Sequence, residues 1–170
     1  ALQPALQSGK LAFNKTDKKV TWHDSCHIGR AGGVYEPPRD LIRAVPGVEF
    51  RELEHNREHG HCCGSVLTLI SEPEVAHDIG AMMLEEVKRT GAEEVLALCP
   101  CCEFQLRVSA EKRNMDVKVT DLASFLAKAR GYKVREDLDH VLSSWATFEA
   151  MIALMLPENM AGLMEELFPQ

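Results

Sequence analysis

The clearest structural signal in this chain is the sequence KKVTWHDSCHIGRAGG at residues 18–33. Val20 and Trp22 alternate with polar residues, which predicts a β-strand over residues 19–23. Three of the five residues at 29–33 are glycine, a composition typical of a loop whose backbone is closely approached by another group. Cys26 therefore lies in a loop that directly follows a strand.

Strand and helix patterns continue to alternate as far as residue 130. We expect strands at residues 19–23, 48–53, 94–98 and 117–119, and helices at residues 37–44, 74–90, 101–113 and 122–130. Four such alternations predict an α/β fold, in which a parallel sheet with right-handed crossovers is covered by flanking helices.

The apolar patterns also predict which faces are buried. The run Val-Leu-Ala-Leu at residues 95–98 is typical of a strand that is buried on both faces. On the long helix at 74–90, a single stripe is expected to face the core. The stripe consists of Val75, Ile79, Met82, Met83 and Val87.

The C-terminal part has a helical period and carries four acidic residues but no lysine or arginine from residue 141 onward. Apolar residues recur every three or four positions on both sides of Pro157, which predicts a helical hairpin. The hairpin either packs on the same domain or docks a partner subunit through its methionines. We therefore expect an N-terminal segment at 1–17, a cysteine-rich domain at 18–132 and a helical extension at 133–170.

The composition excludes several classes of protein. A chain of 170 residues with 45% hydrophobic and 26% charged residues is ordinary for a globular domain. The formal charge of −7 argues against nucleic-acid binding, which needs an excess of lysine and arginine. No apolar run approaches the length of a membrane span, so direct membrane insertion is not expected. The N-terminus has no signal-like segment, and we expect a cytoplasmic protein.

Six cysteines are the unusual feature, and five of them form three blocks that each follow a predicted strand. Cys26 follows the first strand, Cys62 and Cys63 follow the second, and Cys99 and Cys102 follow the third, with Cys101 between them. Because parallel strands end at one edge of a sheet, the three blocks are expected to converge. Thiolates at such a position bind either an iron–sulfur cluster or zinc, or the cysteines are small buried hydrophobes.

The order and spacing of these blocks resemble the cysteine-rich CCG domain, which occurs in the B and D subunits of heterodisulfide reductase and in bacterial relatives. The segments that carry the resemblance are HDSCHIGR at 23–30, HNR at 55–57 with CCG at 62–64, and CPCC at 99–102. The resemblance covers about residues 18–130 and implies a Rossmann-like domain.

The resemblance implies a cluster bound by Cys26, Cys62, Cys63, Cys99 and Cys102, of the non-cubane [4Fe-4S] type, with Cys101 as a substitute for Cys102. It further implies an oxidoreductase subunit that reduces a disulfide or a related acceptor by one-electron steps. Its partners would be an electron-donating iron–sulfur or flavin subunit and a small-molecule disulfide or thiol. Family members usually carry two CCG motifs, so we expect either part of a longer subunit or a one-cluster relative.

Two other functions are consistent with the same residues. Iron–sulfur subunits of lactate, glycolate or glycerol-3-phosphate oxidation systems share CCG domains and would relay electrons without reducing a disulfide. A non-enzymatic interaction module stabilised by zinc needs only four thiolates.

Five histidines lie close to the cysteine blocks, at positions 23, 27, 55, 59 and 61. His61 immediately precedes Cys62 and is the candidate catalytic residue, since it can donate a proton to a departing thiolate. The alternative for His61 is a hydrogen bond to the loop backbone.

Overall fold

The computed structural model describes residues 2–69, 72–135 and 138–155, together with residues 157, 159, 160, 162 and 165. The strands are β1 (Lys18–Trp22), β2 (Val48–Arg51), β3 (Glu94–Ala97) and β4 (Lys118–Asp121). The helices are α1 (Gln3–Gln7), α2 (Glu36–Arg43), η1 (Arg57–His59), α3 (Ser65–Leu69), α4 (Pro73–Thr90), α5 (Pro100–Lys112), α6 (Leu122–Ala129) and α7 (Leu138–Leu154).

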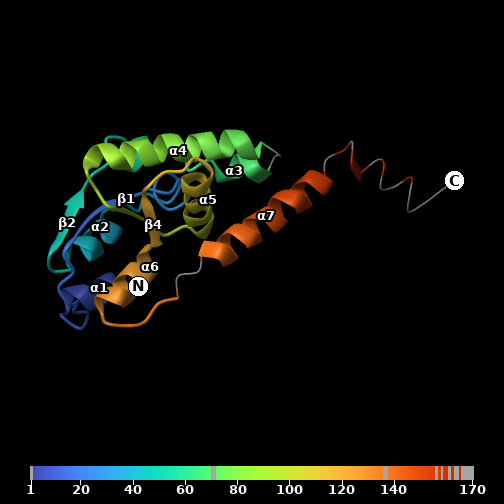
Figure 1. Cartoon of the computed structure of the whole chain (residues 1–170). Helices are drawn as coiled ribbons and strands as arrows, with labels where there is room; N and C mark the ends of the chain where they lie inside the picture. The colour runs from blue at the N-terminus through green and yellow to red at the C-terminus, as the bar shows by residue number, and fades with distance from the viewer. Residues whose placement is uncertain are drawn as a thin grey trace.

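The four strands form one parallel sheet in the order β2-β1-β3-β4, which confirms the predicted α/β class. In register, Val20 of β1 lies opposite Phe50 of β2 and Glu94 of β3. Helices α1, α2 and α6 cover one face of the sheet, and α3, α4 and α5 cover the other (Figure 1). Such a sheet brings its loops together at the carboxyl ends of the strands.

Strand β3 is buried along its whole length, which confirms the prediction for residues 95–97, whereas Leu98, the last residue of the predicted run, follows the strand and is 37% exposed. Leu96 belongs to the core beneath α2 and α6, whereas Val95 and Ala97 belong to the core beneath α4 and α5. Side chains that alternate in direction along a strand account for this division. The strand that leads to Cys99 is therefore fixed from both sides.

The predicted stripe on α4 is wrong at two positions. Val75 and Met82 are 46% and 52% exposed, while the smaller residues Ala76 and Gly80 are buried. A Cβ added at Gly80 would lie 2.7 Å from the Ser109 Cβ of α5, so the two helices approach closely at this point. The prediction considered only large apolar residues, and it therefore did not include the contact between α4 and α5 that the small residue Gly80 allows.

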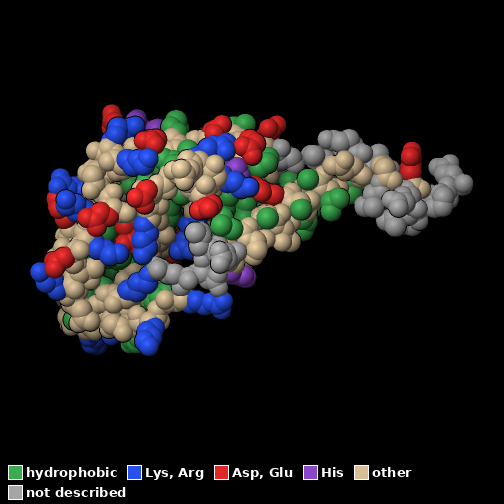
Figure 2. All heavy atoms as spheres, in the orientation of Figure 1, with side chains coloured by type: hydrophobic (Ala, Val, Ile, Leu, Met, Phe, Trp, Pro, Cys, Tyr) green, Lys and Arg blue, Asp and Glu red, His purple; other side chains and the backbone are tan. Residues whose placement is uncertain are grey.

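Helix α7 confirms the first helix of the predicted C-terminal pair and extends away from the α/β body (Figure 1). Helix α7 packs on α5, where the Trp145 ring stacks on Phe104, and Val141 and Trp145 in its first half are buried. Further along, Met151 and Leu154 are exposed, and Figure 2 shows hydrophobic side chains along this helix. Most of the expected second helix, including Leu163, falls outside the described residues.

None of the described helices combines the length and the apolar character that a membrane crossing requires.

Candidate functional site

The sheet topology brings the three cysteine loops to one edge. Strand β1 lies between β2 and β3, and the loops with Cys26, Cys62–Cys63 and Cys99 follow the carboxyl ends of these three adjacent strands. All six cysteines are free thiols. This arrangement is the convergence that the sequence predicts.

Cys63 and Cys102 form the centre of the group, and their sulfur atoms are 3.2 Å apart. Gly64 makes the approach possible, because its φ of +91° belongs to the left-handed region that favours glycine. A Cβ at Gly64 would lie 2.6 Å from the carbonyl oxygen of Ala76, so the turn lies directly against α4. The backbone N–H of Gly64 donates a hydrogen bond to the Cys62 sulfur at 3.4 Å.

The remaining cysteines surround this pair at different depths. Cys62 and Cys99 are half-buried and pack against the core cluster that contains Cys63 and Cys102. Cys26 is half-buried in the loop after β1 and is not part of the closest group of sulfur atoms. Cys101 is exposed in the first turn of α5, whereas Cys102, one position later, points inward.

His23 is a member of this group to which the sequence assigned no role. A ring nitrogen of His23 lies within 4.8 Å of the sulfur atoms of Cys63 and Cys102. Burial lowers the pKa of His23 to about 4, so its imidazole is neutral at pH 7. Its Nε2 is buried and has no hydrogen-bond partner among the described residues. The sequence feature that could have indicated this placement is the position of His23 directly after the strand that leads to Cys26.

The protein environment keeps the thiols of Cys62 and Cys63 protonated. The hydrogen bond between Cys63 and Cys102 raises the pKa of Cys63 to about 12. A hydrogen bond with Cys63, together with burial, raises the pKa of Cys62 well above its ordinary range. Thiolates at these positions therefore require a cation beside them. A buried group of sulfur atoms and an imidazole fits a soft transition metal or an iron–sulfur cluster.

Asp24 connects the loops that carry the cysteines. Its carboxylate accepts hydrogen bonds from the Trp22 indole at 2.8 Å and from the backbone N–H of Arg57 at 2.6 Å. The buried Arg39 guanidinium of α2 donates two more, at 2.9 and 2.6 Å. Asp24 thereby ties the Cys26 loop both to α2 and to the segment that leads to Cys62.

A second group of side chains lies beside the cysteines. The rings of His55 and His61 are stacked with 4.1 Å between their centroids, and both approach Glu86 of α4. The Nδ1 atom of His61 faces the Glu86 carboxylate, and a role of His61 as proton donor to a thiolate stays a prediction. His27 and His59 are exposed and belong to neither group.

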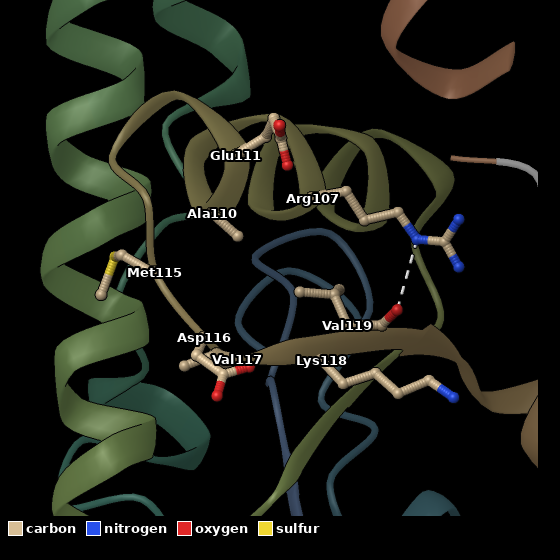
Figure 3. Close-up of a pocket in the computed structure, with 8 residues that line it drawn as sticks. All are labelled: Arg107, Ala110, Glu111, Met115, Asp116, Val117, Lys118 and Val119. Atoms are coloured by element: carbon tan, nitrogen blue, oxygen red, sulfur yellow. Dashed lines mark hydrogen bonds between the residues drawn. The ribbon is translucent and has the colours of Figure 1, made fainter. Parts of the chain in front are cut away.

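Two pockets differ in their relation to the cysteines. One, of about 350 Å³, lies between α5 and α7 and is lined by Ser65, Cys101, Phe104 and Trp145 among others. Another, of about 340 Å³, lies between the second half of α5 and the start of β4 (Figure 3). It is lined by no cysteine or histidine, and Arg107 Nε donates to the Val119 carbonyl in it at 3.2 Å. The first pocket therefore borders the exposed Cys101 and also Ser65, whose hydroxyl lies 3.4 Å from the Cys63 sulfur.

Comparison with known proteins agrees with this geometry. The model of the cysteine-rich domain named CCG matches residues 20–107. The chain is 32% identical over 78% of its length to the D subunit of dihydromethanophenazine:CoB–CoM heterodisulfide reductase from Methanosarcina acetivorans, and covers 33% of that protein. It is 36% identical over 70% of its length to the B subunit of fumarate reductase (CoM/CoB) from Methanothermobacter marburgensis, and covers 24% of it.

A bacterial relative carries the same region. The probable iron–sulfur-binding oxidoreductase FadF of Bacillus subtilis is 33% identical over 75% of this chain, which covers 19% of that protein. The chain thus spans a third or less of the length of these three relatives. The matched region contains all three cysteine blocks and both strands that flank the central strand β1. The chain belongs to the cysteine-rich CCG domain family.

Proposed function

We propose that this chain binds an iron–sulfur cluster on its cysteine loops and transfers electrons as part of an oxidoreductase complex. The observation that carries the proposal is the gathering of free thiols from three loops at one sheet edge, with the Cys63 and Cys102 sulfurs 3.2 Å apart. The relatives named as iron–sulfur or oxidoreductase proteins support the same chemistry.

The proposed ligands are Cys26, Cys62, Cys63, Cys99 and Cys102, and the proposed cluster is a non-cubane [4Fe-4S] centre. Two adjacent cysteines on a tight turn support this choice, because neighbouring thiolates can reach different iron ions of one cluster. The amide of Gly64 donates to the Cys62 sulfur, and such donors stabilise negative charge on the ligands. The ring of His23 lies beside the two central sulfurs, within 4.8 Å, and adds a neutral buried imidazole to the surroundings of the proposed cluster.

When bound, an iron–sulfur cluster supplies one-electron transfer and iron ions with affinity for sulfur. The proposed reaction is the reduction of a disulfide, in which two electrons and two protons convert one S–S bond into two thiols. Electrons would come from another subunit with an iron–sulfur cluster or flavin. The pocket of about 350 Å³ beside Cys101 supports access of a small molecule to this edge of the sheet.

A second candidate function is an electron relay within the same kind of complex. The support for it is the FadF relative, whose name gives iron–sulfur binding and oxidoreductase activity without a disulfide substrate. A site that holds only zinc is the alternative in which no electron is transferred.

Anaerobic iron and acid-labile sulfide analysis, combined with EPR spectroscopy, tests the proposal. We expect about four iron and four sulfide per chain, and an EPR signal of the oxidised protein that changes when a substrate thiol is added. A colourless protein with stoichiometric zinc and no sulfide would refute cluster binding. A cluster whose spectrum responds to no thiol would favour the relay.

A further inference from the structure

Glu86 is a buried carboxylate in an unusual environment. It is 2% exposed, and no lysine or arginine pairs with it among the residues that the structure describes. One of its oxygens, Oε1, accepts a hydrogen bond from the backbone N–H of His55 at 2.6 Å. Burial of an ionised carboxylate is costly unless a positive charge compensates it. A cationic partner at the other oxygen, Oε2, would offset this cost.

The side chains that face Glu86 Oε2 are two imidazoles. The Nδ1 atoms of His55 and His61 lie 3.5 and 3.6 Å from this oxygen. Both Nδ1 atoms are buried, and neither has a hydrogen-bond partner in the described part of the chain. Three potential ligand atoms thus gather within 4.8 Å of one another, and two of them are unsatisfied nitrogen atoms.

The separations match those between ligands of one metal ion. Zinc binds nitrogen and oxygen at about 2.0–2.1 Å, so neighbouring ligands at a tetrahedral ion are about 3.4 Å apart. The two measured Nδ1–Oε2 distances are close to this value. Two histidines and one carboxylate, with a position left open for water, form a ligand set typical of catalytic zinc.

From these observations we infer that His55, His61 and Glu86 form a site for a divalent transition-metal ion such as Zn²⁺, separate from the cysteine ligands. The ion would neutralise the buried carboxylate and satisfy both Nδ1 atoms. The inference does not rest on the proposed function, because none of the three ligands is a cysteine.

Binding requires one local movement. The two rings are stacked with 22° between their planes, whereas a metal ion lies in the plane of each imidazole that binds it. At least one ring must therefore turn about χ2 so that the two Nδ1 lone pairs converge. The His55 and His61 side chains are 42% and 35% exposed, which leaves room for this rotation.

Zinc titration of the anaerobically purified full chain tests the site, with zinc K-edge X-ray absorption to identify the ligands. We expect one zinc ion per chain in a nitrogen and oxygen shell at about 2.0–2.1 Å, distinct from the sulfur shell at about 2.3 Å that cysteines give. His55→Gln and His61→Gln should each weaken zinc binding at least tenfold. Mutation of residues that only hydrogen-bond to a metal ligand already lowers metal affinity about 10- to 100-fold.

His59→Gln is the matched control, because His59 is an exposed histidine of the same loop and lies outside the group. Unchanged zinc affinity in this variant, with loss in the other two, supports the site. A shell that contains sulfur only, equal affinity in all three variants, or no saturable zinc binding would overturn it. Circular dichroism confirms folding, and iron and sulfide analysis of the same samples reports independently on the cluster.

Discussion

The sulfur atoms of Cys63 and Cys102 lie 3.2 Å apart although 39 positions separate the two residues in sequence. Cys63 follows β2 and Cys102 is in the first turn of α5, so β1 lies between the strands that lead to them. The hydrogen bond between the two raises the pKa of Cys63 to about 12. This pair joins the loop after β2 to the start of α5 at the centre of the cysteine group.

Cys101 and Cys102 are adjacent but should differ completely in their effect on cluster content. Cys102 is buried against Cys63, whereas Cys101 is exposed. We expect Cys102→Ser to lose most of the iron and sulfide, because a serine hydroxyl is a poor ligand for iron in a cluster. Cys101→Ser is the matched control and should retain the wild-type content. Equal losses in both variants, measured by anaerobic iron and sulfide analysis, would show that the loop turns differently.

Asp24→Asn should destabilise the protein by about 3 kcal/mol, because it removes the buried one of the two carboxylates that pair with the buried Arg39 guanidinium and leaves only the partly exposed Glu52. Asp17→Asn is the control, since the Asp17–Lys15 ion pair is exposed, and it should cost less than about 1 kcal/mol. Denaturant unfolding of the two variants measures the difference. If Asp24→Asn lowered the unfolding free energy no more than Asp17→Asn does, the role of Asp24 in holding the cysteine loops together would be contradicted.

The same carboxylate gives the stability a defined pH dependence. Burial pushes the pKa of Asp24 upward, but hydrogen bonds from Arg39 and Arg57 outweigh it and leave the pKa below its ordinary value. Asp24 therefore contributes stability above the ordinary pKa of about 4, and this contribution is lost as the pH falls through the lower folded value. In metal-free protein, the unfolding free energy should therefore decrease less steeply below about pH 4 in Asp24→Asn than in the wild type. Equal slopes in the two proteins would contradict this contribution of Asp24.

Gly80→Ala should destabilise the protein by about 1–3 kcal/mol, although alanine is the better helix former. The added Cβ would lie 2.7 Å from Ser109 Cβ and 3.4 Å from the carbonyl oxygen of Cys63. Separating α4 from α5 would also displace the turn that carries Cys63. Met82→Ala, at an exposed position of the same helix, is the control and should cost less than about 1 kcal/mol. Thermal unfolding compares the two, and a stabilised Gly80→Ala protein would disprove the tight contact.

Glu149→Ala should loosen α7 from the α/β body. Glu149 Oε1 lies 3.0 Å from Nε2 of the buried His77 and accepts a hydrogen bond from the Trp145 indole at 2.9 Å. Bonds of a charged group are worth about 1.5–3 kcal/mol each, and partial exposure reduces this. We expect red-shifted Trp145 emission, measured in a Trp22→Phe background, and faster proteolysis within α7.

Thr147→Ala is the control for this helix, since Thr147 is exposed and, among the described residues, its hydroxyl donates within α7, to the Ser143 carbonyl. Its emission spectrum and its proteolysis rate should match those of the parent protein. Matching behaviour of the Glu149 and Thr147 variants would mean that apolar packing alone holds α7 in place.

The cysteine blocks, which are far apart in the sequence, could be predicted to lie together because local sequence patterns predict each strand and helix clearly. Alternation at Val20 and Trp22, proline at the start of α4 and α5, and the αL glycine at Gly91 each predict one element of the α/β unit. The parallel direction of the strands places the cysteine loops along one edge of the sheet, and the strand order β2-β1-β3 in the structure makes the three loops neighbours. Gly91, with a φ of +73°, ends α4 where the sequence predicts.

The sequence by itself therefore determined the α/β class, the strand that precedes each cysteine block and the family. Only the tertiary structure decided which side chains meet at the sheet edge. It buried Cys102 against Cys63 and left Cys101 exposed, buried His23 beside two sulfurs and placed Glu86 against His55 and His61. The physical reason is that local patterns report backbone propensity and the burial of large apolar groups. A close approach through Gly80, or a buried polar group with its partner across the fold, exists only once the helices have packed.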